Sequence, residues 1–229
     1  MEHIVITGAD RGIGCALTEV FLKNGYTVYA GQFMPAWPQL AELKDLYADR
    51  LHLVPLNVGD EHSVQKAAAI IGAMTDHIDY LVNCAGVFPL SDDADAFMNA
   101  FQINSLGPLR MIEHFLPLMK TGSKKLCTFS SETGVIPLMQ RTKDFSYCVS
   151  KAALNMEMHM LFQKLRPQGY TFRLFHPGWV KSYMYGTKST VGDFEPEEAA
   201  LAAYQYFTGS GEIDDVLIMR DIRGQYWPF

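Results

Sequence analysis

The amino-acid sequence predicts an α/β fold: a doubly wound parallel sheet of about seven strands with helices on both faces, typical of a Rossmann-type domain. Two observations predict it. Short apolar runs alternate with helical patterns along the whole chain, and a glycine-rich turn joins the first run to the first helical pattern. Strands that alternate with helices pair in parallel, because each helix carries the chain back across one face of the sheet.

Composition predicts one soluble domain over residues 1–229. Hydrophobic residues make up 48% of the chain and charged residues 19%, as in ordinary globular proteins. The net charge of −6, without a dense lysine or arginine run, argues against a nucleic-acid partner. No apolar run approaches the roughly 20 residues that cross a bilayer, and Met1 leads into Ile4-Val5-Ile6-Thr7 without a basic segment. We therefore expect neither a membrane span nor a secretory signal.

The cysteines indicate a reducing environment. Cys15, Cys84, Cys127 and Cys148 all lie inside apolar stretches. None forms a CxxC pair or a Cys/His cluster with zinc spacing, so no metal site is expected. Buried, reduced cysteines are typical of a cytoplasmic protein, which is the location we expect.

The first predicted element is a strand over residues 3–7. It leads into Gly8-Ala9-Asp10-Arg11-Gly12-Ile13-Gly14 and then into a helix that ends near Asn24-Gly25. This arrangement places backbone N–H groups and a helix N-terminus under a pyrophosphate, and glycine allows the close approach that a Cβ would block. The spacing is G-xxx-G-x-G rather than G-x-G-xx-G, and a tight turn without a ligand is the alternative.

The later elements continue the alternation. Further strands are predicted at residues 27–30, 51–55, 78–83, 125–130, 170–175 and 215–219. Further helices are predicted at residues 38–47, 60–71, 94–119, 147–167 and 196–207. Asp60 is a credible N-cap, and Pro38 and Pro196 suit helix starts. Asn83-Cys84-Ala85-Gly86 follows a central strand, where open α/β sheets bind ligands.

Tyr147 and Lys151 lie four residues apart on a predicted helix, so they share one face, one turn apart. An ammonium near a phenol favours the phenolate and is expected to lower the pKa of Tyr147, which could then exchange a proton with a carbonyl or an alcohol. A surface pair without function is the alternative. Asn104 is polar in an apolar helix, where a hydrogen-bonded core asparagine is the alternative to a functional role.

Together, these segments resemble the short-chain dehydrogenase/reductase family, in order and along almost the whole chain. The residues that carry the resemblance are Thr7-Gly8-x-x-x-Gly12-x-Gly14, Asn83-Cys84-Ala85-Gly86, Asn104, Ser131-x-x-Gly134, Tyr147-x-x-x-Lys151 and Pro177-Gly178-x-Val180. Glycine spacing and length distinguish the chain from the longer, epimerase-like branch of that family.

The resemblance implies hydride transfer between a nicotinamide and a carbonyl or alcohol carbon. Tyr147 would be the general acid in carbonyl reduction or the base in alcohol oxidation, and Ser131 would donate a hydrogen bond to the substrate oxygen. Lys151 would lower the pKa of Tyr147 and bind the nicotinamide ribose. Asn104 would hold a water that links Lys151 to solvent.

The resemblance also implies the cofactor contacts. They are Gly8, Arg11, Gly12, Ile13, Gly14, Asn57, Val58, Asn83, Ala85, Gly86, Tyr147, Lys151, Pro177, Gly178 and Val180. Asn57 replaces the usual aspartate that touches adenine. Residues 32–34 carry neither an acid for the ribose of NAD nor an arginine for the phosphate of NADP. Arg11 resembles a basic residue of NADP-preferring members, so NADP(H) is favoured over NAD(H).

Loops at the carboxyl side of the sheet predict an apolar pocket for a ketone or an alcohol. Residues 182–195 would form a substrate loop, and residues 135–146 would bulge over the substrate. The aromatic and apolar residues concerned are Phe88, Pro89, Leu138, Met139, Trp179, Tyr183, Met184 and Tyr185, with packing of the loops as the alternative for each. Glu132 is expected to be a solvated loop residue and His176 an ordinary strand-end histidine.

The leading hypothesis is an NAD(P)-dependent oxidoreductase that acts on a small-to-medium apolar carbonyl compound or secondary alcohol. The alternative is a sensor or regulatory protein that binds NAD(P) without turnover. The uncharged residues 32–34 favour the alternative, and the complete catalytic set opposes it. The expected partner is a small molecule, not nucleic acid or a membrane. The resemblance implies a homodimer or homotetramer, paired through the helices of Asn104 and Tyr147.

Overall fold

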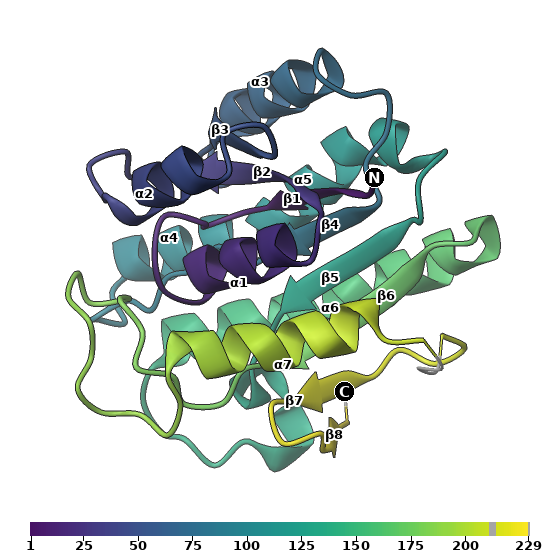
Figure 1. Cartoon of the computed structure of the whole chain (residues 1–229). Coiled ribbons are helices and arrows are strands. Elements are labelled where there is room, and N and C mark those ends of the chain that lie inside the picture. Colours follow the sequence, from purple (N-terminus) through teal and green to yellow (C-terminus); the bar gives the residue numbers. More distant parts are fainter. Residues whose placement is uncertain (211–213, 229) are drawn as a thin grey trace.

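The computed structural model describes residues 1–210 and 214–228 and contains an eight-stranded sheet (Figure 1). Its strands are β1 (His3–Ile6), β2 (Thr27–Gln32), β3 (Leu51–Pro55), β4 (Tyr80–Asn83), β5 (Lys125–Phe129), β6 (Thr171–His176), β7 (Met219–Asp221) and β8 (Tyr226–Trp227). They lie in the order β3-β2-β1-β4-β5-β6-β7-β8. In the described residues every pairing is parallel except that of β7 with β8. The strand order changes direction between β1 and β4, which confirms the doubly wound α/β fold.

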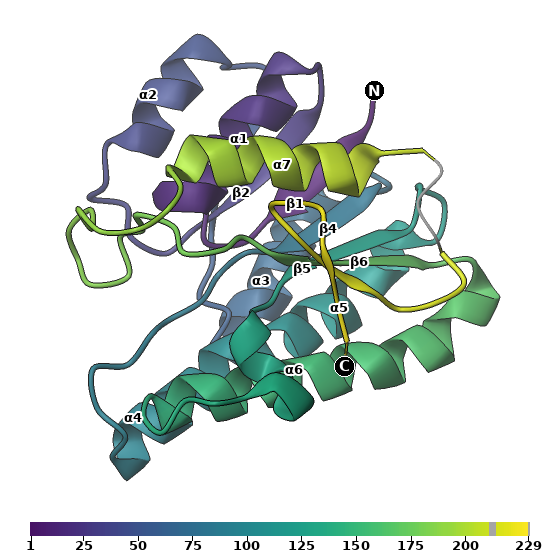
Figure 2. The same cartoon turned by 90° about the horizontal axis from the view of Figure 1, so that it is seen from below.

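Helices cover both faces of this sheet (Figure 2). They are α1 (Gly12–Lys23), α2 (Gln39–Leu46), α3 (Glu61–Gly72), α4 (Ala94–Asn104), α5 (Leu106–Met119), α6 (Phe145–Leu165) and α7 (Pro196–Thr208). Short 3-10 turns lie in the connections: η1 (Glu132–Gly134), η2 (Ile136–Leu138) and η3 (Arg166–Gln168). Helices α1, α2 and α7 pack on one face, and α3, α5 and α6 pack on the other.

Alternating side chains along the strands fill a core on each face. In β1, Ile4 and Ile6 belong to the core under α1 and α7, whereas Val5 belongs to the core under α3, α5 and α6. Phe21 on one face and Phe115 on the other are fully buried. Burial of such a side chain stabilises the fold by roughly 1.5–3 kcal/mol relative to its exposure. With both faces covered, the loops at the carboxyl edge of the sheet are the natural place for a site.

The structure corrects the single long helix predicted at residues 94–119. Two helices occupy this range, with α4 ending at Asn104 and α5 beginning at Leu106. Pro108 explains the break, because it has no N–H to donate to the carbonyl of Asn104, four residues earlier. Proline is well placed in the first turn of α5, where no such donor is needed. Asn104 therefore lies at a helix end rather than in a helix interior.

The strand predicted at residues 215–219 is misplaced. Strand β7 begins at Met219, which pairs with Leu174 of β6. Asp215 instead forms a surface ion pair with Arg166, at 2.7 Å. The chain then turns back to form β8, which contains only 2 residues and pairs with β7. Sequence periodicity did not predict β8, because so short a strand shows no alternation of apolar and polar residues.

Candidate active site

The glycine turn after β1 packs against the turn after β4. Gly8 has a φ of +64°, and a Cβ on it would lie 2.7 Å from the Cα of Ala85. Thr7 Oγ1 accepts hydrogen bonds from the amides of Cys84 and Ala85, each at 3.0 Å. A Cβ on Gly14 would lie 2.2 Å from the carbonyl oxygen of Gly8. The two turns are therefore fixed together at the carboxyl edge of the central strands, with room only for glycine at these positions.

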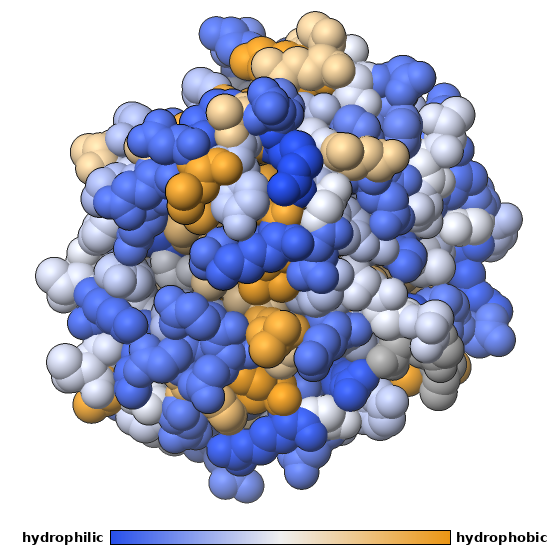
Figure 3. Space-filling view, in the orientation of Figure 1, coloured by the Kyte–Doolittle hydropathy of each residue, from blue (hydrophilic) through white to orange (hydrophobic). Residues whose placement is uncertain are grey.

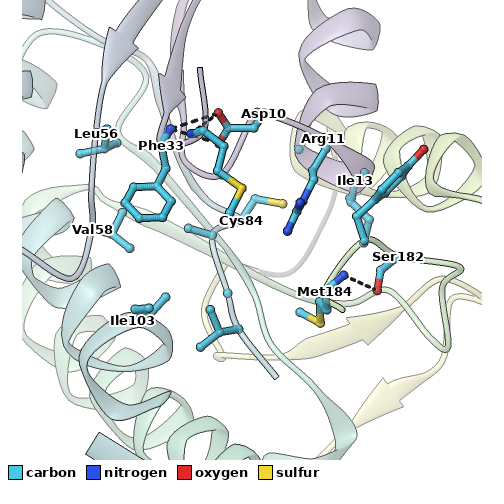
Figure 4. Close-up of a pocket in the computed structure, with 18 of the residues that line it drawn as sticks. Asp10, Arg11, Ile13, Phe33, Leu56, Val58, Cys84, Ile103, Ser182 and Met184 are labelled. Carbon is cyan, nitrogen blue, oxygen red and sulfur yellow. Dashed lines mark hydrogen bonds between the residues drawn. The ribbon is translucent and has the colours of Figure 1, made fainter. Parts of the chain in front are cut away.

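A pocket opens where these turns meet α1 and the loop after β6 (Figure 4). The predicted cofactor residues that line it are Gly8, Arg11, Gly12, Ile13, Gly14, Asn57, Val58, Ala85 and Gly86. The predicted cofactor residues outside its lining are Asn83, Tyr147, Lys151, Pro177, Gly178 and Val180. Lining residues that were not predicted as cofactor contacts are Asp10, Phe33, Met34, Leu56, Cys84, Val87, Ile103, Ser182, Tyr183 and Met184.

This pocket has the features of a dinucleotide site. Arg11 is the N-cap of α1 and has an extended backbone, and no side chain among the described residues caps the first amides of that helix. Uncapped N–H groups at a helix start attract an anion such as a pyrophosphate. The backbone hollow at Gly8, which a Cβ would fill, lies beside them. The residues present therefore fit the phosphates of a nicotinamide dinucleotide.

Asp10 and Arg11 shape the end of the pocket beside β2. The Asp10 carboxylate accepts hydrogen bonds from the amides of Phe33, at 3.1 Å, and Met34, at 2.8 Å (Figure 4). The guanidinium carbon of Arg11 lies 4.6 Å from the centre of the Trp37 ring, which is a cation–π contact. Backbone amides thus satisfy the negative charge of Asp10. The Trp37 ring holds the Arg11 side chain in the pocket lining, and the guanidinium can still attract an anion there.

The structure brings Ser131, Tyr147 and Lys151 together. Ser131 follows β5, and Tyr147 and Lys151 lie one turn apart on α6. The Ser131 side chain lies close enough to the Tyr147 phenol to affect its pKa. The ammonium of Lys151 lies 5.9 Å from the centre of the Tyr147 ring and donates a hydrogen bond to the carbonyl of Phe129 at 3.0 Å. A phenol, a hydroxyl and an ammonium therefore meet at the carboxyl edge of β5.

Asn104 joins this group through hydrogen bonds that fix the backbone. Its Oδ1 accepts from the amide of Val87 at 2.8 Å, and its Nδ2 donates to the carbonyl of Val87 at 2.9 Å and to Ser150 Oγ at 3.0 Å. Ser150 Oγ in turn donates to the carbonyl of Tyr147 at 2.7 Å. Asn104 thereby ties α6 to the segment after β4. Any water held by Asn104 must use the second lone pair of Oδ1 or the backbone carbonyl, because both amide protons are used.

Comparison with known proteins identifies the family. A model of the short chain dehydrogenase family matches residues 2–191. The chain belongs to the short chain dehydrogenase family. It is 34% identical over 191 residues to short-chain dehydrogenase PC-15 of Penicillium crustosum, covering 80% of this chain and 68% of that protein. Its fold matches that of an NADPH-bound carbonyl reductase from chicken fatty liver with a TM-score of 0.87 and 26% identity, covering 100% of this chain and 99% of that chain.

A mammalian relative is longer. The chain is 28% identical over 206 residues to estradiol 17-beta-dehydrogenase 2 of Mus musculus, which covers 86% of this chain but only 52% of that protein. The chain thus spans about half the length of this relative. Family membership makes the protein an NAD(P)-dependent oxidoreductase that transfers hydride between a nicotinamide and a carbonyl or alcohol carbon.

Among residues 1–210 and 214–228, every helix is either too short or too polar to span a bilayer. In the same part of the chain, no three His, Cys, Asp or Glu side chains are grouped so that they could hold a metal ion.

The surroundings of Tyr147 and Lys151 alter the proton affinity of both side chains. Burial raises the pKa of Tyr147 above its usual range, the Glu132 carboxylate adds to the rise, and the hydrogen bond with Ser131 opposes it. Burial lowers the pKa of Lys151 to about 8. The pKa of Tyr147 is therefore raised, not lowered as expected, and the ammonium of Lys151 is turned toward the carbonyl of Phe129.

Ser131 is hydrogen-bonded to its acidic neighbour, Glu132, which the sequence predicted to be a solvated loop residue. Its Oγ donates to Glu132 Oε2 at 2.8 Å, and Glu132 Oε1 accepts from Arg141 at 3.0 Å. His176 Nε2 lies 3.2 Å from Glu132 Oε2. The prediction that Glu132 is a solvated loop residue is wrong, and His176, although at the end of β6, belongs to the same cluster. Periodicity could not relate these residues, because they come from different elements.

An aromatic group lies beside Tyr147. The ring centres of Phe88 and Tyr147 are 4.6 Å apart, and those of Phe88 and Tyr185 are 5.9 Å apart. Tyr183 instead packs edge-on against Trp37, with ring centres 5.6 Å apart, and lines the cofactor pocket. Phe88 and Tyr185 thus lie beside Tyr147, Tyr183 and Met184 line the pocket at the glycine turn, and Leu138 and Met139 line a separate pocket with Glu132 and Arg141.

Asp10 and Trp37 are the residues near the pocket whose contacts sequence reasoning missed most clearly. Asp10 lies inside the glycine turn, but the amides that it binds follow β2. Parallel pairing of β1 with β2 brings the ends of these strands side by side, so the expected topology could have suggested the contact. Trp37 lies in a loop without periodicity, and nothing in the sequence related it to Arg11.

Proposed function

We propose that this protein interconverts apolar ketones or aldehydes and their alcohols, with Tyr147 as the group that gives or takes the proton. The position of Ser131 near the Tyr147 phenol, with the ammonium of Lys151 5.9 Å from the centre of the Tyr147 ring, is the observation that carries the proposal. Two neighbouring hydroxyls can both reach one substrate oxygen. A nearby cation stabilises the charge left after proton transfer.

The chain's own residues account for the proton and for the orientation of the substrate. A bound nicotinamide would supply the hydride in reduction and take it in oxidation, with its phosphates held by the glycine turn and Arg11. Tyr147, which its raised pKa keeps protonated, donates its proton to the substrate oxygen, and Ser131 gives that oxygen a second hydrogen bond. Lys151, with a pKa of about 8, places positive charge near the phenolate that remains.

The test is a screen of ketones and diketones with NADPH and with NADH, in which cofactor oxidation is followed. We expect turnover in the wild type, and we expect Tyr147→Phe to lower kcat by roughly 10²–10⁴-fold, because the proton donor is lost. Tyr170→Phe, which removes a phenol from the start of β6, is the matched control. Unchanged turnover in Tyr147→Phe contradicts the mechanism. Cofactor binding without turnover of any compound supports the sensor hypothesis instead.

We also propose that the preferred coenzyme is NADP(H). Arg11 offers a guanidinium at the end of the pocket beside β2, while the Asp10 carboxylate that could repel a phosphate is bound by two amides. Residues 32–34 bring no carboxylate for a ribose. The solved relative with bound NADPH supports the same choice.

Fluorescence titration of both coenzymes tests this choice. We expect Arg11→Met to weaken NADPH binding by roughly 10–100-fold, since a charge-assisted hydrogen bond contributes about 1.5–3 kcal/mol. Methionine keeps aliphatic contact with Trp37, and NADH affinity should change little. A wild type that binds NADH more tightly, or an Arg11→Met variant that weakens both coenzymes equally, contradicts the proposal.

We propose an apolar substrate pocket formed by Phe88, Tyr185 and the loop 182–195. The Phe88 ring lies tilted against the Tyr147 ring, and Tyr185 packs edge-on against Phe88, so a substrate carbonyl at Tyr147 would meet two aromatic rings. Such rings favour apolar or aromatic groups next to the reacting carbon. The KM values of aliphatic and aromatic ketones in the same screen test this class.

We further propose a homodimer in the cytoplasm. Helix α6 exposes Phe145, Val149, Met156 and Met160, which share one face. The face that carries α1 and α7 is mostly hydrophilic, with smaller apolar patches between polar residues (Figure 3). A continuous apolar stripe on one long helix suits pairing with a second copy. The four cysteines are free thiols, which supports a reducing compartment.

A further inference from the structure

The hydroxyl of Ser131 has its proton committed to another side chain. Ser131 Oγ lies 2.8 Å from Glu132 Oε2 and also contacts the amide of Thr133, at 3.2 Å, and Thr133 Oγ1, at 3.0 Å. A serine hydroxyl has one proton and two lone pairs, and an ionised carboxylate can only accept. The proton of Ser131 therefore points to Glu132, and its two lone pairs face the amide and the hydroxyl of Thr133.

Glu132 is itself held in place by groups on two other segments. Arg141 Nη2 donates to Oε1 at 3.0 Å, and its Nη1 lies 3.5 Å from Asp144. His176 Nε2 lies 3.2 Å from Oε2. With both oxygens engaged, the carboxylate has little freedom to leave Ser131.

Other ionisable groups surround this cluster. The negative charge of Glu132 helps to raise the pKa of both Tyr147 and Cys148 on α6. Asp221 of β7, Arg141 and Lys151 act on His176, and the Trp227 ring packs edge-on against His176 with centres 5.6 Å apart. His176 is largely buried, and its Nδ1 has no partner within the described residues. The cluster thus lies between the catalytic phenol and the end of the sheet.

We propose that Glu132 is a positioning residue for the reaction: clamped by Arg141 and His176, it holds the Ser131 oxygen in a fixed position near Tyr147, from which the hydroxyl can reach the substrate oxygen. The inference rests on the function proposed above. Glu132 and the substrate oxygen are competing acceptors for one proton. A neutral carbonyl is the weaker acceptor, so the Ser131 proton turns to the substrate as negative charge develops there, in the transition state.

A double-mutant cycle tests whether Glu132 acts through Ser131. We expect Glu132→Ala to lower kcat by about tenfold or more in the wild type, because the hydroxyl loses its anchor, and to have no further effect in Ser131→Ala. Glu132→Gln keeps an acceptor at the same place and should stay within about threefold of the wild-type kcat. An equal loss from Glu132→Ala in both backgrounds overturns the proposal. So does a Glu132→Gln variant as impaired as Glu132→Ala, which indicates an ion pair that only supports the loop.

A second measurement does not depend on turnover. The Glu132 carboxylate raises the pKa of His176 against the effect of burial, so the NMR titration of the His176 ring should shift to lower pH in Glu132→Gln. The His176→Asn variant assigns the signal. An unchanged titration overturns the proposal, because the cluster is then not formed. If the titration shifts but no carbonyl compound is turned over by the wild type, the proposed function fails instead.

Discussion

Lys151 is a buried residue whose pKa is changed by its surroundings. Its side chain is buried, and its ammonium donates to the carbonyl of Phe129. Loss of hydration favours the neutral amine, which lowers the pKa of Lys151 to about 8. The folded protein therefore releases this proton at a lower pH than the unfolded chain, whose lysine has a pKa near 10.4.

The free energy of unfolding should depend on pH because the pKa of Lys151 differs between the folded and unfolded states. Between the folded and unfolded pKa values of Lys151 the unfolded chain binds one more proton, so the stability contributed by this group rises with pH. We expect the free energy of unfolding of the wild type, relative to Lys151→Met, to increase by about 2 kcal/mol from pH 7.5 to 9.5. Urea unfolding of both proteins at the two pH values measures it. Parallel changes in wild type and variant would mean that Lys151 titrates normally.

Residue identities in the site were easier to predict than their contacts. Tyr147, Lys151 and Ser131 were found from motif spacing, and the structure brings them together. The direction of the pKa change at Tyr147 could not be predicted in this way. It depends on burial and on the Glu132 carboxylate, and motif spacing reveals neither of them. The contacts of Glu132 could not be predicted either, because Arg141 and His176 reach it only through the fold.

At the scale of elements, α6 has two tasks. It presents Tyr147 and Lys151 to the site from one side and exposes an apolar stripe on another. A helix with apolar residues on opposite sides buries one of them in its own core and leaves the other for a partner.

Charge on the exposed stripe should separate the two copies. We expect the double change Met156→Glu and Met160→Glu to convert a dimer into a monomer, because carboxylates are costly to bury in an apolar interface. Light scattering coupled to size-exclusion chromatography measures the mass. Leu201→Glu on the exposed face of α7 is the matched control and should leave the dimer intact. A wild type that is already monomeric contradicts the proposed pairing.

Elements with strong local signals were predicted well, and those shaped by neighbours were not. The Asp60 side chain caps α3 by accepting from the amide of His62, as its residue type predicted. The break between α4 and α5 could have been predicted from Pro108, whose missing N–H removes one hydrogen bond of a continuous helix and favours a break there. Strand β8 could not, since its 2 residues are strand only because β7 lies beside them.

At the scale of the whole molecule, the site lies where the strand order changes direction. The turns after β1 and β4 interlock, so the cofactor pocket is built from backbone that both halves of the sheet hold in place. Alternation of strands and helices predicted the fold class. The position of each strand in the sheet, and hence the meeting of these turns, follows from tertiary pairing that local patterns do not contain.

Cofactor binding should therefore stabilise the whole fold. A ligand that binds only the folded state at 100 times its Kd adds about 2.7 kcal/mol, which corresponds to a rise in Tm of roughly 5–10 °C for a chain of this size. We expect this rise with NADPH and a smaller one with NADH at the same concentration. Differential scanning fluorimetry measures both. Equal shifts with the two coenzymes would contradict the NADP(H) preference, and no shift with either would contradict the pocket assignment.

The two edge strands of the sheet limit how copies of this chain can associate. Strand β8 presents only 2 residues at one margin, and β3 at the other ends in Pro55 and has the carbonyl of Leu51 bonded to Lys44. Short, interrupted margins offer poor templates for adding a strand from another molecule. The two edges therefore disfavour aggregation by strand addition. Copies of this chain would instead associate through helix surfaces, where a closed dimer can form.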